Sequence, residues 1–198
     1  MSYDYDKLQF FRVRPSDTPT GHVAIAPAEA FIDGPHMSAA VILALDLGIL
    51  DDALSGIRFP FLELAVFQTR VDLKLGEDGR FILLGSPKHG PEAFGPANDA
   101  ELEDSIAETR EDIEEEHGIA LGASVRLEGP VSEGDARPFS YCRGEDIYWC
   151  QSHGAASYGV DGPQWLYVGC VQFDFYFGTV YGFYNKEAGI ARLVFECT

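Results

Sequence analysis

Ten carboxylate side chains fall within the eighteen residues 99–116, where Arg110 is the single cation. They are Asp99, Glu101, Glu103, Asp104, Glu108, Glu111, Asp112, Glu114, Glu115 and Glu116. Eighteen residues of α-helix rise about 27 Å, so a helix here would carry a carboxylate about every 2.7 Å, approaching the charge density of duplex DNA. Such a surface could occupy the cationic groove of a nuclease or of another nucleic-acid-binding protein.

The spacing of this segment predicts a two-sided helix that gives up stability to carry its charge. Its apolar stripe consists of Leu102, Ile106, Thr109 and Ile113, and the opposite face of Asp104, Glu108, Glu111 and Glu115. Like charges four residues apart repel by a few tenths of a kcal/mol, and the last glutamates lie at the negative end of the helix dipole.

We therefore predict that this helix binds a basic partner. The partner-binding residues would be Asp104, Glu108, Glu111, Asp112 and Glu115. The competing interpretation is a solvated helix face, as charge runs usually are. It is supported by the rest of the chain, which carries −9 of the net charge of −18 because the segment contributes ten anions and one cation.

Four cysteines, Cys142, Cys150, Cys170 and Cys197, suggest thiol chemistry, but only Cys150 and His153 are closely spaced. A structural zinc site favours ligands paired two to four residues apart, and Cys142 has no such neighbour. Cys150 could instead attack as a nucleophile with His153 as its base, yet no glycine-rich oxyanion turn accompanies the pair. We expect no metal and no cofactor.

A second candidate site lies in the aromatic C-terminal part of the chain. Gln172, Asp174 and Tyr176 alternate with Val171, Phe173, Phe175 and Phe177, so the polar residues would share one face of a strand. We expect Trp165, Tyr167, Tyr181 and Tyr184 near that face. The alternative ligand-binding set is therefore Cys150, His153, Gln172, Asp174 and Tyr176, although ordinary alternation also produces such a wet face.

The composition restricts the classes of partner. With 46% hydrophobic and 13% aromatic residues the chain must fold into a packed domain. Its 32 acidic against 14 basic residues repel nucleic acid and anionic lipid and attract basic proteins. Solubility or adaptation to a salt-rich host would explain the same acidity without any binding role.

The chain shows no signal for export or membrane insertion. The N-terminus has neither a basic nor an apolar region, and the apolar stretch Met37–Leu50 is too short to span a bilayer. We expect a cytoplasmic protein with reduced thiols and no membrane contact.

The elements that must position these residues are mostly strands. Leu8–Arg14, His22–Ala26 and Phe67–Leu75 alternate as strands do, and the last is expected to form a hairpin with Arg80–Leu84. Ser38–Leu54 is apolar nearly all round over Ala39–Leu45, which predicts a buried helix.

The second half continues this pattern. We expect the acidic helix over 99–117, stopping at Gly118, then turns at Gly129-Pro130 and 133–135. Three strands over 171–177, 179–184 and 190–196 complete a meander, and the segments 66–84 and 171–195 are faintly alike. The predicted fold is a single α+β domain over 1–198. It has a mostly antiparallel sheet, one buried helix, one acidic surface helix and a candidate hinge at 85–98. Two related β units are a candidate plan for the sheet.

Motifs for nucleotide phosphates, dinucleotides, zinc proteases and α/β-hydrolases are absent. The sequence therefore favours a non-enzymatic binding protein for a basic partner, such as an immunity protein or inhibitor that neutralises a toxin or nuclease. A small-molecule-binding domain or enzyme with its site in the C-terminal half is the first alternative. A structural or assembly subunit is the second, and the oligomeric state stays open.

Overall fold

The structure is a computed structural model of the chain. It describes residues 8–24, 30–33, 39–64, 70–88, 90–91, 100–136, 139–144, 147, 149, 154–173 and 178–197. Only the backbone is described at 39–40, 63–64, 100–103, 105–106, 109, 116–117, 139, 173, 178 and 197.

Strands dominate the described part of the chain. The strands are β1 (Leu8–Pro15), β2 (Gly21–His22), β3 (Ile32–Asp33), β4 (Ala39–Asp46), β5 (Arg58–Leu64), β6 (Arg70–Leu75), β7 (Phe81–Gly85), β8 (Ser124–Val131), β9 (Phe139–Gly144), β10 (Trp165–Phe173), β11 (Gly178–Asn185) and β12 (Ile190–Cys197). The helices are α1 (Ala100–His117), the four-residue α2 (Glu133–Ala136) and α3 (Ala155–Tyr158), and the 3-10 turns η3 (Leu47–Ile49) and η4 (Asp52–Leu54).

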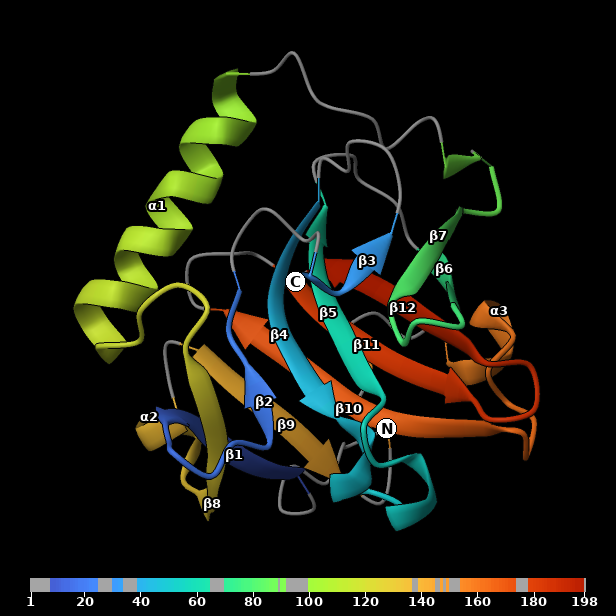
Figure 1. Ribbon diagram of the computed structural model, residues 1–198, viewed down its shortest axis with the longest axis horizontal. Helices are drawn as coiled ribbons and strands as arrows, with labels where there is room; N and C mark the ends of the chain where they lie inside the picture. The colour runs from blue at the N-terminus through green and yellow to red at the C-terminus, as the bar shows by residue number, and fades with distance from the viewer. Residues whose placement is uncertain are drawn as a thin grey trace.

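All twelve strands belong to one sheet, in the order β3-β7-β6-β12-β11-β10-β9-β1-β8-β2-β4-β5. Every neighbouring pair is antiparallel except the short pair of β3 with β7. The predicted mostly antiparallel sheet is confirmed, and it joins strands from both ends of the described chain (Figure 1). The suggestion of two related β units stays a prediction; the hairpins concerned, β6–β7 and β11–β12, are neighbours through the β6–β12 pair.

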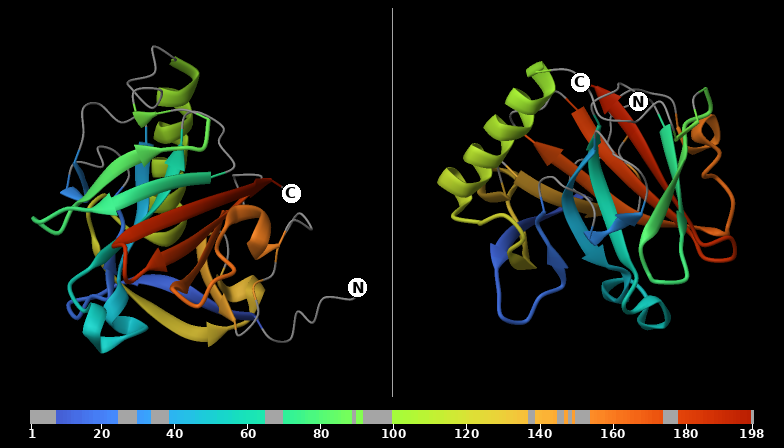
Figure 2. Two further views of the ribbon diagram at one scale, coloured as in Figure 1. Left: turned by 90° about the vertical axis from the view of Figure 1, so that its right-hand side faces the viewer. Right: turned by 45° about the horizontal axis from the view of Figure 1, so that its top comes forward.

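The sheet folds back on itself, because the end strand β5 packs against the middle strands β11 and β12. This arrangement defines an inner face, which holds the larger apolar core, and an outer face, which carries α3 (Figures 1 and 2). Gly182 of β11 permits the close approach: a Cβ atom there would lie 2.6 Å from Cε1 of Phe59 and 2.9 Å from Cε1 of Phe61. Both rings are fully buried, and their centroids are 5.1 Å apart.

The prediction of a buried helix over Ser38–Leu54 is wrong. Residues 39–46 form strand β4, and the two 3-10 turns follow it. Consecutive residues from Val41 to Leu45 are at most 1% exposed, so this strand is buried on both faces. A strand without a wet face shows no alternation and cannot be told from a buried helix by its pattern. Asp46 ends it by accepting hydrogen bonds from the backbone N–H groups of Gly48 (2.8 Å) and Gly56 (3.0 Å).

The strands that have one face more exposed to solvent than the other were predicted correctly. β6 and β7 form the expected hairpin, and β10, β11 and β12 form the expected meander, although β10 begins earlier, at Trp165. The expected turn at Gly129-Pro130 is wrong, since both residues lie within β8. Together they stand opposite the single residue Phe11, so β8 has one extra residue where the β1–β8 register shifts, and their peptide bond is cis.

The acidic helix was also predicted correctly: α1 ends at His117, and the N–H of Gly118 bonds to the carbonyl of Glu114. The first residue of the predicted helix, Asp99, and most of the candidate hinge 85–98 lie outside the described residues. Among the described helices, none combines the length and apolar character that crossing a bilayer requires.

We expect Gly182→Ala to lower the free energy of unfolding by about 1–3 kcal/mol, because the added methyl group would clash with the buried rings of Phe59 and Phe61. Gly134→Ala is the matched control, since a Cβ there meets nothing within 4 Å. Urea denaturation of both variants measures the difference. Equal stabilities would contradict the close packing of β5 on β11.

Candidate functional site

The outer surface of α1 presents an exposed row of carboxylates. Asp104, Glu108, Glu111 and Glu115 are all exposed, as the helical spacing predicts. Ile113, on the opposite side, is 1% exposed and belongs to the larger core. Helix α1, which lies at the edge of the molecule (Figure 2), therefore docks through Ile113, while the four acids are exposed to solvent.

The fifth predicted partner-binding residue differs from the other four. Asp112 is half-buried, as is Glu114, whose carboxylate accepts from the backbone N–H of Leu121 (3.3 Å) and pairs with Arg110 (3.5 Å). Glu114 therefore helps to hold the C-terminal end of the helix. The available acidic row is reduced to Asp104, Glu108, Glu111 and Glu115.

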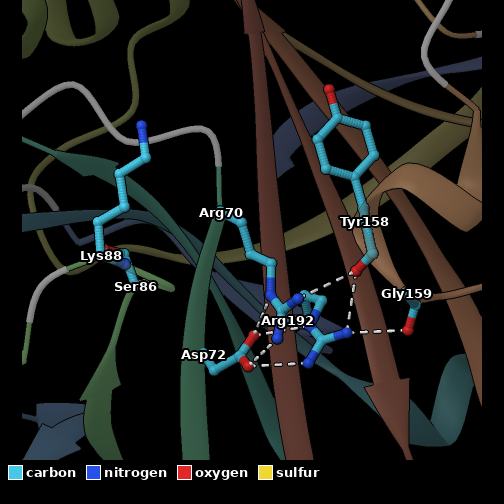
Figure 3. Close-up of polar contacts among 7 residues, drawn as sticks. All are labelled: Arg70, Asp72, Ser86, Lys88, Tyr158, Gly159 and Arg192. Carbon is cyan, nitrogen blue, oxygen red and sulfur yellow. Dashed lines mark hydrogen bonds and ion pairs between the residues drawn. The ribbon is translucent and has the colours of Figure 1, made fainter.

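A second polar arrangement lies on the other side of the molecule, on the outer face of β6 and β12. Asp72 accepts two hydrogen bonds from Arg192, from Nε (2.7 Å) and Nη2 (2.8 Å), and two from Arg70, from Nη2 (2.7 Å) and Nε (3.3 Å). Arg192 also donates to the carbonyl oxygens of Tyr158 (3.0 Å) and Gly159 (2.8 Å) (Figure 3). This arginine–aspartate cluster (Arg70, Asp72 and Arg192) thus fastens the end of α3 to the sheet.

The pair of Arg192 with Asp72 is largely shielded from water, which strengthens the attraction between the two charges. The side chains of Arg192 and Asp72 are 10% and 19% exposed, and the Arg192 guanidinium lies 4.5 Å from the centroid of the Trp165 ring. Burial disfavours ionised Asp72, but the hydrogen bonds from Arg192 and Arg70 outweigh burial and lower the pKa of its carboxyl.

Tyr158 provides a second attachment of α3. Its hydroxyl donates to Oε1 of Glu196 (2.9 Å), a residue that is 1% exposed on β12. Burial, followed by the interaction with Glu196, raises the pKa of the Tyr158 hydroxyl well above its usual value. The ring of Trp149 packs against Tyr158, Tyr181 and Phe183, with ring centroids 5.3, 4.9 and 5.9 Å away.

Gln172 is the only member of the predicted polar face Gln172, Asp174 and Tyr176 that the structure describes, and it lies on the outer side of the sheet. Gln172 lies directly between Ser140 of β9 and Thr179 of β11, and Thr179 pairs with Glu196. Ser140, Thr179 and Glu196 are at most 3% exposed, so this row is an internal feature and not a wet surface. Tyr167 and Tyr181 share the outer side, whereas Tyr184 packs in the inner core, so it does not lie near Gln172 as predicted.

The other members of the alternative ligand site, Cys150, His153, Asp174 and Tyr176, lie outside the described residues. The two described cysteines with side chains, Cys142 and Cys170, are buried cross-strand neighbours on β9 and β10. Within the described part of the chain, no group of three or more His, Cys, Asp or Glu side chains is arranged to hold a metal ion.

No family model matches the chain, and neither the curated proteins nor the solved structures contain a significant match. Function must therefore be inferred from the geometry. Sequence reasoning found the acidic row but missed the arginine–aspartate cluster, because Asp72 and Arg192 are 120 residues apart. Their only sequence signal was that each stands at a polar position of an alternating strand.

We expect Asp72→Asn to lower the free energy of unfolding at pH 7 by about 2–4 kcal/mol, because it leaves two guanidinium groups without their carboxylate. The pKa of Asp72 is lowered in the folded state, so its contribution is complete above the ordinary value near 3.8 and is lost as pH falls through the folded value. Denaturation at several pH values should show the variant and the wild type converging below about pH 4.

The exposed residue Asp17 provides the control, because Asp17→Asn removes a charge from the surface and should change stability little. A difference between Asp72→Asn and the wild type that does not shrink at any pH below about 4 would show that the charge of Asp72 does not stabilise the fold.

Proposed function

We propose that this chain is a non-enzymatic binding protein that engages a basic protein through the exposed acidic row of α1. An inhibitor or immunity protein that neutralises a toxin or nuclease is the concrete form. The observation that carries the proposal is the exposure of Asp104, Glu108, Glu111 and Glu115 along one side of a helix whose other side is docked.

The repulsion among the acids of the row lowers the stability of helix α1, and this loss of stability supports a binding role for the row. Asp104 and Glu108, and likewise Glu111 and Glu115, stand four residues apart and repel each other. Arg110 reaches Glu114 and not these four acids among its described contacts. A surface helix that served solubility alone could reduce this repulsion with lysines on the same face, and none is present in α1.

The row of carboxylates would act mainly by raising the rate at which the chain and its basic partner encounter each other. Aligned carboxylates attract a basic groove over a Debye length, about 10 Å at 0.1 M salt. Charges at the edge of an interface mainly raise the association rate constant, whereas buried aromatic or arginine anchors supply most of the affinity. The association rate should therefore be more sensitive to these acids than the dissociation rate.

The test is a quadruple variant, Asp104→Asn with Glu108→Gln, Glu111→Gln and Glu115→Gln. A basic partner is first retained from host lysate on the wild-type protein at low salt, purified, and measured by surface plasmon resonance. At low ionic strength we expect the variant to associate at least about tenfold more slowly, with a weaker salt dependence.

The matched control removes four exposed acids elsewhere: Asp17→Asn, Glu77→Gln, Asp161→Asn and Glu187→Gln. It changes the net charge equally, so it reports the effect of overall acidity. If both variants slow association equally, the acidity acts as a general property of the protein and α1 has no dedicated role. If neither changes it, the proposal fails.

A further inference from the structure

Two cysteines lie directly opposite each other in the sheet, apart from the acidic row and the arginine–aspartate cluster. Cys142 of β9 and Cys170 of β10 are partners in the antiparallel pairing of these two strands, which lie side by side in Figure 1. Both are buried thiols, and their side chains are 0% and 3% exposed. Because opposite residues of an antiparallel pair point to the same face of the sheet, the two sulfur atoms share one buried place.

The backbone sets the two residues at a separation that a disulfide can span. Opposite residues of antiparallel strands have Cα atoms about 4.5 Å apart in a non-hydrogen-bonded pair and about 5.5 Å apart in a hydrogen-bonded pair. A disulfide bridges Cα separations of about 4.4–6.8 Å. Both kinds of pair fall within this range, so bonding the two sulfur atoms requires side-chain rotation and little movement of the strands.

The pair lies within the smaller apolar core, on the outer face of the sheet. Phe10 of β1 stands opposite Cys142, and Tyr181 of β11 stands opposite Cys170. These four residues share one core cluster with Tyr158 of α3. The thiols are therefore sheltered by aromatic neighbours, and a small oxidant has better access to them than a large one.

A polar group borders the pair within this apolar core. The hydroxyl of Ser140, which is 3% exposed, lies 3.8 Å from Sγ of Cys142. The thiolate is the nucleophilic form of cysteine, and a hydroxyl group can donate a hydrogen bond to it. Cys142 therefore has a neighbour that can support its reactive form, whereas a cysteine that only fills space needs none.

We propose that Cys142 and Cys170 form a redox-sensitive clamp, which is a dithiol in reducing surroundings and a cross-strand disulfide after reaction with hydrogen peroxide. One sulfur attacks the peroxide and breaks its O–O bond, giving a sulfenic acid and one molecule of water. The second thiol then attacks that sulfur, forms the S–S bond and releases the sulfenic oxygen as a second water. Two electrons pass from the pair of sulfurs to the peroxide.

The disulfide would fasten the sheet at its centre. Strands β9 and β10 are neighbours at the middle of the twelve-strand order, and the covalent loop over 142–170 would contain α3. Closing such a loop restricts the unfolded chain, so the oxidised protein should resist unfolding more than the reduced protein. The clamp does not involve α1, and it does not depend on the function proposed for that helix.

The experiment treats the full chain carrying Cys150→Ser and Cys197→Ser, which keeps only the proposed pair, with hydrogen peroxide at pH 7. We expect both thiols to be lost together, the mass to fall by that of two hydrogen atoms, and a peptide map after alkylation to link position 142 to position 170. The melting temperature should rise by about 5 °C or more, and dithiothreitol should reverse the change.

Cys142→Ala and Cys170→Ala, each made in the same chain, are the matched controls because each removes one sulfur of the pair. Neither should form an intramolecular disulfide, and peroxide should not raise the melting temperature of either. The same peptide map and melting curves on the wild-type chain keep the test decisive if a variant fails to fold.

The proposal is overturned if the folded protein keeps both thiols at a peroxide concentration that oxidises free cysteine. It is also overturned if either residue ends as a sulfinic acid, or if the wild-type map links Cys142 or Cys170 to another cysteine instead. A disulfide between 142 and 170 that leaves the melting temperature unchanged would overturn its role as a clamp.

Discussion

The structure depends on burying both faces of its middle strands. The folded-back end of the sheet covers the inner face of β11 and β12 with Phe59 and Phe61, and this contact requires that position 182 have no side chain. The outer face of the same strands is covered by Trp149 and the α3 segment. With apolar material on both sides, the meander β10–β11–β12 becomes the rigid centre to which the other elements are attached.

The residues that cover the inner face of the middle strands and those that cover the outer face are held in place by different interactions. On the inner face the contacts are apolar: the ring of Phe59 packs edge to face with Phe81 and is tilted against Phe61. On the outer face the chain includes a four-residue helix, too short to be stable alone, so polar contacts supplement the aromatic ones. Arg192 binds the carbonyl oxygens at the end of α3, and Glu196 binds the hydroxyl of Tyr158. The buried charged side chains of Arg192 and Glu196 fix the position of the α3 segment and also contribute to the stability of the fold.

The acidic row and the arginine–aspartate cluster lie on opposite sides of the molecule, with α1 on one side and the α3 segment on the other (Figure 1). The acidic row is an extended surface of one sign, which suits the attraction of a large basic partner. The arginine–aspartate cluster is instead small and partly buried, and its contacts hold α3 on the sheet. The separation of α1 from this cluster means that one can be altered without direct contact with the other.

The sequence alone determined the elements whose pattern is local. The run of acids around a narrow apolar stripe identified α1 and the exposure of Asp104, Glu108, Glu111 and Glu115, because helical spacing decides which side chains share a face. Alternation likewise identified the β6–β7 hairpin and the C-terminal meander. Only the tertiary structure decided that Ala39–Asp46 is a strand, because burial on both faces removes alternation, and that Asp72 meets Arg192, because no local rule joins positions 120 residues apart. The acidic row is therefore a property of one helix, while the arginine–aspartate cluster exists only because the sheet brings β6 and β12 together.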